Sequence, residues 1–538
     1  MKIAGIWSGH DCAYYISENG KPIVHAEYER YIREKEPAGD AAEFMFSEHN
    51  DCQDIKYFAS CYPDKNIKRH ETSFQKMSQI ANDNDGQIFF LGHHMAHAAN
   101  AFFSSNFSDS LILTIDGGGL ESQDFVSACT VWHGKDNKID HVHTFPIRQV
   151  NIGGVWTRTT RYVFNLQSGW PRGHQAGTIM AMAAMGDPDR FREDFHLMLT
   201  RDIQYASFKP PEQPKGANVG TDPKHPYLYR WREIADRSEQ DRFDVAAGIQ
   251  SATEDFLKQL LGSILQQVQV ENICLAGGVA LNSVAVGKIK TWYPQIKDVY
   301  VTPTPHDGGL PIGAAQYIWH QHLGNPRIPW EDNFTPYLGY TYKNIDDTLE
   351  KYADAIETET SDDDAVVNLL SEGNIIAVFG DGSESGRRAL GNRSILADPR
   401  NPNMKDMINE KVKHRQWFRP FAPSILREEV KNWFTEDKNS PYMSFVLKFK
   451  EDMKDKVPAV LHFDGSARLQ TVTENDNKWY YNFIKKWYEV SGVPIVLNTS
   501  FNDREPICET AEHALNCFLR TNIDYLYFYN ENVLVRKK

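Results

Sequence analysis

The sequence predicts an α/β fold, and the main evidence is where its short apolar runs end. Each run leads into a glycine pair, as in residues 111–115 before DGGG, residues 273–276 before Gly277 and Gly278, and residues 299–301 before HDGG at 306–309. Such runs are typical of buried strands, and glycine at a strand end lets the backbone approach a ligand closely. Helical patterns at residues 246–261 and after Gly309 lie between the runs. This alternation predicts an α/β domain whose ligand cleft lies at the strand ends.

A composition change predicts a second domain. Residues 324–363 are rich in proline, aspartate and threonine, which places the boundary near residue 350 and gives domains of residues 1–350 and 351–538. The second domain is expected to open with a strand at 375–379 and to end with a strand at 494–498 and a helix. The apolar face of that helix is Ala511, Ala514, Leu515, Phe518 and Leu519. We find no internal repeat.

Composition and charge exclude several classes of protein. The 538 residues include 58 basic and 72 acidic side chains, for a net charge of −14. This balance disfavours general adhesion to nucleic acid or anionic membranes but leaves room for a local pocket that binds a small anion. The 7 cysteines form no CxxC pair, and no apolar run approaches the roughly 20 residues of a membrane helix. We therefore expect a reduced, cytoplasmic protein without a signal peptide.

The segment LGHHMAHAAN predicts a metal site. His93 and His97 are four residues apart, so on a helix they point the same way and can share one ion. The glycine-rich strand ends offer Asp116 and Asp307 as oxygen ligands. Two imidazoles with two carboxylates suit Fe(II), Mn(II) or Zn(II). The alternative is a buried polar helix face, and His94 is expected to be packed or to support the ligands.

Basic residues of the second domain predict an anion pocket. Arg388, Lys413, Arg419 and Arg468 lie among glycines, prolines and aromatic residues rather than along a solvated helix. Guanidinium groups bind phosphate through two parallel hydrogen bonds, so such a cluster suits a phosphorylated ligand. The alternative is an internal salt-bridge network. Structural pairing is the expectation for Arg387, Arg393 and Arg415.

Two further segments offer polar groups at strand ends. Asn498 and Ser500 follow an apolar run and can both contact one ligand, although such residues also end strands in turns. In SGHDC, His10 follows a strand and a glycine and has Asp11 beside it. An imidazole there could deprotonate a hydroxyl nucleophile, although a lone histidine is more often structural. No GxxxxGK[ST] is present and no GxGxxG follows a strand, which argues against Walker-type and dinucleotide-binding sites.

These motifs together resemble the O-carbamoyltransferases, which include the nodulation-factor, cephalosporin and tobramycin enzymes. The family's strings occur in order along nearly the whole chain: HHMAHAANAFFSS, DGGG, GTIMAMAAMGDP, LAGGVALNS, HDGGLPIGAA, RALGNRSILADPR, FRPFAPSIL, RLQTV and LNTSFNDREPI. The resemblance implies an N-terminal domain of the actin/hexokinase type (ASKHA) and a C-terminal YrdC-like α/β domain. The second domain would form carbamoyl-adenylate from carbamoyl phosphate and ATP, and the first would transfer the carbamoyl group to a hydroxyl.

The resemblance also implies residue roles. His93, His97, Asp116 and Asp307 match metal ligands for Fe(II), with Mn or Zn as alternatives and Mg expected with ATP. Carbamoyl-phosphate contacts fall on Arg388, Lys413, Arg419, Arg468, Asn498 and Ser500. His10, with Asp11, matches the histidine beside the acceptor, and the expected nucleotide-binding residues are Gly117, Gly118, Gly277, Gly278 and Asn282. The family's GRxEFGPRALG differs here, because Gly382 replaces an arginine and Arg387 replaces the proline.

Several alternatives stay open at this point. A tRNA threonylcarbamoylation enzyme would combine the same two domains, and a scaffold that binds metal and nucleotide without chemistry would fit the loss of arginine at Gly382. The acceptor could be a sugar, another small molecule or a modified base, and Trp156, Tyr162 and Trp170 are candidates to line its pocket against the alternative that they are core residues. A homodimer is expected from base rates.

Overall fold

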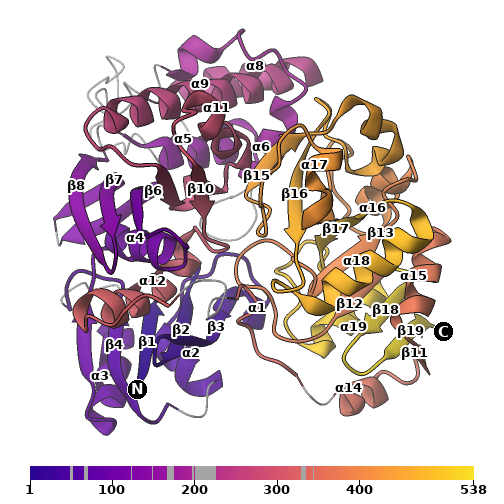
Figure 1. Cartoon of the computed structure of the whole chain (residues 1–538), viewed down its shortest axis with the longest axis horizontal. Coiled ribbons are helices and arrows are strands. Elements are labelled where there is room, and N and C mark those ends of the chain that lie inside the picture. The colour runs from indigo at the N-terminus through magenta and orange to yellow at the C-terminus, as the bar shows by residue number, and fades with distance from the viewer. Residues whose placement is uncertain are drawn as a thin grey trace. The chain divides into compact units, whose positions relative to one another are not determined.

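The chain divides into two units, both of the α/β class that the sequence predicts (Figure 1). The structure is a computed structural model that describes residues 1–48, 52–65, 71–122, 124–147, 150–166, 175–196, 199, 226–328, 335–342 and 345–538. Unit 1 consists of Met1–Glu29 and Lys35–Phe334, and unit 2 of Arg30–Glu34 and Thr335–Lys538. Among the described helices, none combines the length and the apolar character needed to cross a bilayer.

Unit 1 contains two five-stranded sheets with the same strand order. The first runs β3-β2-β1-β4-β5 and consists of β1 (Lys2–Trp7), β2 (Ala13–Glu18), β3 (Lys21–Glu27), β4 (Ile55–Ser60) and β5 (Gln87–Phe90). The second runs β8-β7-β6-β9-β10 and consists of β6 (Asp109–Ser122), β7 (Phe125–Lys135), β8 (Lys138–Pro146), β9 (Asn272–Ala276) and β10 (Asp298–Val301). In both sheets three antiparallel strands precede two strands that run parallel to the first.

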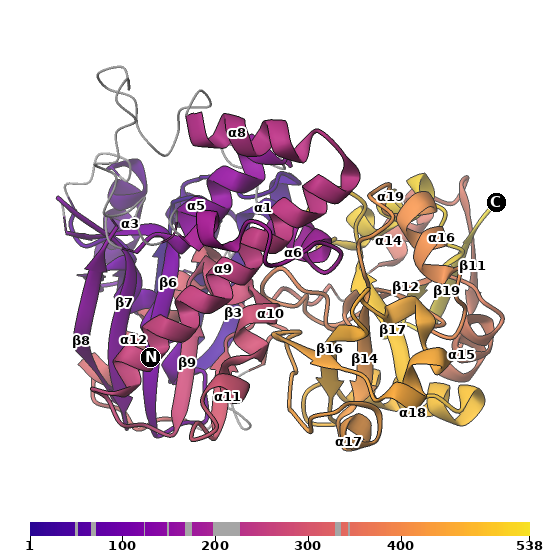
Figure 2. The same ribbon diagram turned by 90° about the horizontal axis from the view of Figure 1, so that it is seen from above.

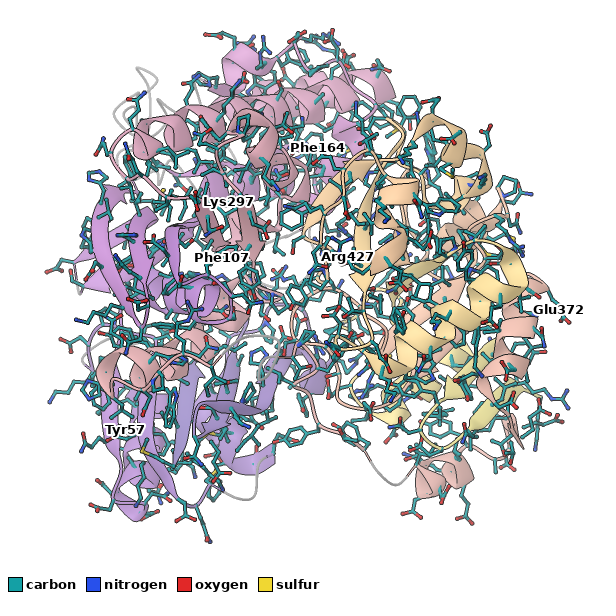
Figure 3. The ribbon with its side chains drawn as sticks, in the orientation of Figure 1. Tyr57, Phe107, Phe164, Lys297, Glu372 and Arg427 are labelled. Atoms are coloured by element: carbon teal, nitrogen blue, oxygen red, sulfur yellow. The ribbon has the colours of Figure 1, made fainter. Side chains whose placement is uncertain are left out.

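This repeated order is that of the actin/hexokinase-type fold that the resemblance implied. The sequence shows no internal repeat because the two halves share a strand order rather than residues. In Figure 3, Tyr57 marks β4 of the first sheet and Phe107 marks the connection that leads into β6 of the second. The predicted strands at 111–115, 273–276 and 299–301 are confirmed, and β6 continues through the DGGG segment to Ser122.

Helices α4 (His93–Phe103) and α12 (Leu310–Tyr317) form the layer between the two sheets (Figure 1). Each follows the last strand of its half, so α4 comes after β5 and α12 after β10. Their backbones are very close, because a Cβ atom at Gly313 would overlap the carbonyl oxygen of Ala96 on α4. A Cβ at Gly5 of β1 would overlap the carbonyl of Pro311 in the same way. Glycine at these positions lets α12 pack against both α4 and β1.

Replacing Gly313 with alanine is therefore expected to destabilise unit 1. The added methyl group meets backbone rather than a movable side chain, and overpacking of this kind typically costs about 1–3 kcal/mol. Chemical denaturation of the purified protein measures the change. Gly177→Ala is the matched control, since nothing lies within 4 Å of a Cβ at that position. An unchanged midpoint in Gly313→Ala would contradict this packing.

The remaining described helices of unit 1 pack around the two sheets, some against the first sheet and some against the second. They are α1 (Tyr28–Ile32, shared with unit 2), α2 (Ala41–Glu48), α3 (Glu71–Asp83), α5 (Ile152–Arg158), α6 (Ala176–Ala183), α8 (Pro226–Ala235), α9 (Glu239–Leu265), α10 (Ser283–Gly287) and α11 (Ile289–Trp292). Helix α9 contains the predicted helix at 246–261, and α8 packs beside it (Figure 2). Ser238 caps α9 by accepting a hydrogen bond from the backbone N–H of Asp241.

Unit 2 is built on one mixed nine-stranded sheet, in the order β11-β19-β18-β12-β13-β17-β14-β16-β15. Its strands are β11 (Ile356–Thr360), β12 (Ile376–Phe379), β13 (Arg393–Ala397), β14 (Ala422–Leu426), β15 (Phe445–Lys448), β16 (Ser466–Val472), β17 (Ile495–Ser500), β18 (Tyr525–Phe528) and β19 (Val533–Lys537). One apolar core holds α15 (Asp363–Ser371) and α18 (Lys478–Ser491). Another holds α16 (Met404–Lys411), α17 (Val430–Trp433) and α19 (Ala511–Arg520), which carries the predicted apolar face.

The boundary between the units lies at Phe334/Thr335, whereas the sequence predicted it near residue 350. The segment after Thr335 already packs within unit 2, because the backbone N–H of Gly339 donates to the carbonyl of Ser383 and Ile345 lies in the core beside α14 (Asp346–Lys351). Arg30 also belongs to unit 2, where it donates to the carbonyl of Gly386. No compositional signal marks that short N-terminal segment.

Candidate metal and anion sites

The four predicted metal ligands of unit 1 come together. His93 Nε2 and His97 Nε2 lie 3.1 Å apart, and they are 3.1 and 3.3 Å from Asp116 Oδ2. Asp307 Oδ1 is 3.5 Å from His93 Nε2 and 3.4 Å from His97 Nε2. The four ligand atoms all lie within 4.8 Å of one another. The two histidines lie one turn apart at the start of α4, so they share one face as the sequence predicted.

The backbone around the two aspartates aims their oxygens. Asp116 Oδ1 accepts hydrogen bonds from the N–H groups of Gly117 (2.7 Å) and Gly278 (3.2 Å), which leaves Oδ2 directed at the imidazoles. Gly277, the residue before Gly278, has φ at +88°. A Cβ atom at this position would overlap the backbone carbonyl of Ile115. The predicted nucleotide-binding glycines Gly117 and Gly278 therefore orient Asp116 in this structure.

The charges of the cluster are unbalanced without a cation. Burial, reinforced by the charge of Asp116, raises the pKa of Asp307 to about 7. Burial would also raise the pKa of Asp116, but hydrogen bonds from His93 and His97 hold that pKa well below its usual value. Asp307 Oδ2 and His97 Nδ1 are buried and have no hydrogen-bond partner among the residues that the structure describes. Convergent imidazole and carboxylate donors with an uncompensated buried carboxylate fit a divalent ion such as Fe(II), Mn(II) or Zn(II).

Two neighbours position the first turn of α4. His94 is fully buried, and its Nε2–H donates to the carbonyl of Ser127 while Nδ1 accepts from Thr114 Oγ1. Burial lowers the pKa of His94 to about 3, so it stays neutral and packed, as expected. Glu121 accepts a hydrogen bond from the backbone N–H of His94 and caps the helix. The sequence analysis missed Glu121, because nothing in LESQD distinguishes it from a surface glutamate.

His10 stands at the edge of the cluster. Its Nε2 lies 3.4 Å from Asp307 Oδ2, and its side chain is 31% exposed. The next residue, Asp11, is buried and has φ at +57°, in the left-handed region. An imidazole that contacts a buried carboxylate and also reaches solvent can exchange a proton with a bound molecule.

Other predicted residues of unit 1 have internal partners. Asn282 caps α10 by accepting from the N–H of Ala285, and it exchanges hydrogen bonds with Gln250. Trp156 is buried, and its Nε1–H donates to Thr253 Oγ1, so it is a core residue. Tyr162 lies beside the guanidinium of Arg161, and Trp170 lies outside the described residues. Gly118 has φ at +142°, a conformation that favours glycine.

Three predicted anion-binding arginines of unit 2 repel one another. Burial and the charges of Arg468, Arg387 and Arg419 hold the pKa of Arg388 well below its usual value. Burial likewise lowers the pKa of Arg419 and of Arg468 to about 10. In the part of unit 2 that the structure describes, no carboxylate lies within 4.0 Å of these three arginines. A salt-bridge network does not explain them, and an anion would neutralise them.

Lys413 and Asn498, two further predicted anion-binding residues, make hydrogen bonds within unit 2. Lys413 Nζ donates to the carbonyls of Ser500 (2.5 Å) and Asn502 (2.8 Å) and to Asn502 Oδ1 (2.8 Å). Asn498 Nδ2 donates to the carbonyl of Ala389, next to Arg388, and its buried Oδ1 has no hydrogen-bond partner in the described part of the chain. Lys413 therefore fixes the end of β17, and Asn498 ties that strand to the loop that bears Arg388.

Glu384 organises the same loop and was missed by the sequence analysis. Its Oε1 accepts hydrogen bonds from the backbone N–H groups of Leu390 (2.7 Å), Asn392 (2.8 Å) and Arg393 (3.1 Å). Arg393 is fully buried and donates to the carbonyls of Gly380, Asp381, Asn392 and Glu509. Arg393 thus has the expected structural role, but its hydrogen bonds go to backbone carbonyls rather than to carboxylates.

Glu384→Ala is expected to destabilise unit 2 by at least about 3 kcal/mol. The change leaves three buried N–H groups without an acceptor, and each unsatisfied group costs about 1–3 kcal/mol. Glu384→Gln keeps one acceptor oxygen and should lose much less. Urea unfolding of both variants measures the difference, and equal stability of the alanine variant and the wild type would contradict this role.

The structure explains why the loop lacks an arginine at Gly382. A Cβ at this position would lie 2.5 Å from the carbonyl oxygen of Gly339 and 3.0 Å from that of Tyr337. The chain therefore requires glycine here. Arg387 replaces the family's proline and contributes to the positive charge around Arg388. Arg415, also expected to pair structurally, donates to Asn409 Oδ1 and to the carbonyl of Pro420.

Fold and sites together define a two-unit α/β enzyme with a histidine–aspartate cluster in one unit and an arginine cluster in the other. Residues 61–316 match the family described as Carbamoyltransferase N-terminus, and residues 367–537 match Carbamoyltransferase C-terminus. The chain belongs to this carbamoyltransferase family, as the sequence resemblance implied.

The chain is also similar to individual proteins. The chain is 35% identical over 448 residues to nodulation protein NolO of Bradyrhizobium diazoefficiens, covering 81% of this chain and 77% of that protein. It is 33% identical over 488 residues to an uncharacterized protein of Synechocystis sp., covering 82% and 75% of the two chains. Among solved structures, full-length HypF in its phosphate- and nucleotide-bound form aligns with a TM-score of 0.36 and 12% identity, over 60% of this chain and 47% of that chain.

Proposed function

We propose that this enzyme is an O-carbamoyltransferase that uses carbamoyl phosphate and ATP. It would form carbamoyl-adenylate and transfer the carbamoyl group to a hydroxyl of a small-molecule, sugar or nucleoside-type acceptor. The observation that carries the proposal is the cluster of Arg388, Arg419 and Arg468, which repel one another and have no carboxylate partner within 4.0 Å among the described residues. A phosphorylated co-substrate supplies the missing negative charge.

The proposed first step takes place at this arginine cluster. Water displaces phosphate from carbamoyl phosphate and leaves carbamate, whose oxygen attacks the α-phosphorus of ATP. Pyrophosphate leaves, and the product is carbamoyl-adenylate. Guanidinium groups stabilise the charge on phosphate oxygens during both displacements, and Asn498 and Lys413 keep the loop and the end of β17 in place.

The proposed second step takes place at the histidine–aspartate cluster of unit 1. His93, His97, Asp116 and Asp307 would hold a divalent ion, which supplies Lewis-acid polarisation and orients the adenylate. The acceptor oxygen attacks the carbamoyl carbon, the bond to AMP breaks, and the hydroxyl proton passes to the imidazole of His10. The contact between His10 and Asp307 stabilises the imidazolium that forms.

A screen of hydroxylated compounds tests this function. The protein is incubated with ATP, labelled carbamoyl phosphate and each candidate acceptor, and the products are analysed by mass spectrometry. The proposal predicts AMP, pyrophosphate and an acceptor that has gained one carbamoyl group. Transfer of a threonylcarbamoyl group to adenosine of tRNA instead would favour the tRNA-modifying alternative, against which the net charge of −14 argues. Absence of any turnover of ATP and carbamoyl phosphate would support a non-catalytic scaffold.

A further inference from the structure

The face of helix α4 that bears the two histidines carries a third polar residue, Asn100. It follows His93 by seven residues and His97 by three, so the three side chains share one face of the helix. Asn100 is fully buried, and it is not one of the four proposed metal ligands. A buried amide is held by its hydrogen-bond partners, so these partners show which part of the chain this face of α4 contacts.

Both groups of the Asn100 amide bind the segment that carries Asp307. The Nδ2 group donates to the carbonyl of Thr304 at 2.9 Å, and Oδ1 accepts from Thr302 Oγ1 at 3.2 Å. The two threonines lie between the end of β10 and Asp307. The contact is also close after Asp307, because a Cβ atom at Gly309 would lie 2.4 Å from Asn100 Nδ2. Asn100 therefore contacts the segment on both sides of the aspartate.

Two further contacts connect the same segment to the sheets. The backbone N–H of Gly277, at the end of β9, donates to the carbonyl of Pro305 at 2.7 Å. On the other side, the buried imidazole of His25 on β3 donates through its Nε2–H to the carbonyl of Gly308 at 2.7 Å. These hydrogen bonds join the segment to one strand of each sheet of unit 1. The amide of Asn100 joins it to the helix of the histidines.

The position of the Asp307 carboxylate depends on such contacts. Asp307 begins a 3-10 turn of only three residues, and a turn of this length has few hydrogen bonds of its own. The charge of Asp116 also repels the Asp307 carboxylate, which works against the convergence of the two side chains. Metal ligands must be held within about 0.5 Å of the productive geometry, so neighbouring elements have to keep this segment in place.

We propose that Asn100 is a positioning residue of the metal site. It holds the segment around Asp307 against α4 and so fixes the distance between that carboxylate and the two imidazoles on the helix. Asn100 acts through the backbone of the segment rather than as a ligand of the ion. This inference rests on the metal site of the proposed function and adds to it a residue outside the ligand set. Loss of a supporting contact of this kind typically weakens metal binding by about 10- to 100-fold.

Titration of the metal-free full chain with Co(II) tests the inference. Asn100→Leu keeps a branched side chain but loses both hydrogen bonds, and Thr302→Val removes only the hydroxyl that Asn100 accepts from. We expect the dissociation constant for Co(II) to rise at least about tenfold in Asn100→Leu and by a smaller factor in Thr302→Val. The visible absorption spectrum of the bound Co(II) should change as well, because it depends on the coordination geometry.

Thr253→Val is the matched control. Thr253 is buried on α9, where its Oγ1 accepts from Trp156 Nε1–H and donates to the carbonyl of Ile249. This variant should lose stability but keep the wild-type Co(II) affinity and spectrum, and thermal unfolding checks that each variant folds. If Asn100→Leu does not fold, Thr302→Val decides the test.

The outcomes separate this inference from the proposed function. Wild-type Co(II) affinity and spectrum in the folded variants of Asn100 and Thr302 would refute the positioning role alone. Equal loss of affinity in Thr253→Val would also refute it, because the effect would then follow from general loss of packing. A wild type that binds no Co(II) would contradict the metal site of the proposed function itself. Pyrophosphate release that depends on carbamoyl phosphate should be normal in all three variants, since the proposed first step takes place in unit 2.

Discussion

Arg388→Ala is expected to lower the carbamoyl-phosphate-dependent release of pyrophosphate from ATP by about 100- to 1,000-fold, the range seen when one donor to an anionic centre is removed. The side chain is surrounded by Arg387, Arg419 and Arg468, so in the absence of ligand its removal relieves repulsion. We therefore expect the variant to be as stable as the wild type or more stable. Activity and stability should change in opposite directions, as is common at binding sites that concentrate like charge.

The control for this experiment is Arg427→Ala. Arg427, labelled in Figure 3, belongs to unit 2 and pairs with Asp437 near the surface, so its loss should leave pyrophosphate release unchanged. Phosphate or carbamoyl phosphate should raise the thermal midpoint of the wild type and of Arg427→Ala, but not that of Arg388→Ala. A destabilised Arg388→Ala with normal pyrophosphate release would show that the arginines serve structural pairing instead.

His97→Ala is expected to prevent metal binding at the proposed site and to abolish carbamoyl transfer. The substitution deletes one of four convergent ligands and leaves the ion with three, and loss of even a supporting partner typically weakens metal binding by about 10- to 100-fold. Metal analysis after dialysis measures occupancy without reference to activity. Adding Fe(II), Mn(II) or Zn(II) to metal-free wild type should raise its thermal midpoint, because the ion binds the folded state and relieves the repulsion between Asp116 and Asp307.

His133→Ala provides the matched control for this second experiment. His133 lies on β7 and pairs with Asp109 at a partly exposed position, so its loss should change neither metal content nor transfer. Fully active wild type that contains no ion would contradict the metal site. Unchanged metal content in His97→Ala would show that the cluster is instead the buried polar helix face that the sequence left as an alternative.

The features of the fold and the site that depend on local sequence patterns could be predicted from the sequence. The spacing of His93 and His97 fixes a common helix face, and the apolar runs before the glycine pairs fix the strands that bring Asp116 and Asp307 to the same edge. The convergence of these four side chains is confirmed, whereas the ion and the residue roles remain proposals. For Arg388, Arg419 and Arg468, the turn-rich context indicated an anion pocket, and their lack of carboxylate partners among the described residues supports it.

The residues that were missed act through contacts between distant segments. Glu121 caps α4 from a strand of the second sheet, and Glu384 binds N–H groups within an irregular loop, so neither follows a periodic pattern. From the sequence, Gly382 is interpreted as the loss of an arginine that the family has at this position. Only the structure shows why glycine is required, because the carbonyl oxygen of Gly339 lies too close for a Cβ atom. The segment Arg30–Glu34 joins unit 2 through a buried contact between Arg30 and Glu509, which composition cannot reveal.

One assay tests most directly whether the two units catalyse different steps. Pyrophosphate and carbamoylated product are measured in parallel for Arg388→Ala and His97→Ala. If unit 2 activates the carbamoyl group and unit 1 transfers it, Arg388→Ala loses both products. His97→Ala should then still release pyrophosphate when given ATP and carbamoyl phosphate, yet form no carbamoylated acceptor. Pyrophosphate release that survives in Arg388→Ala, or that disappears in a folded His97→Ala, would contradict this account.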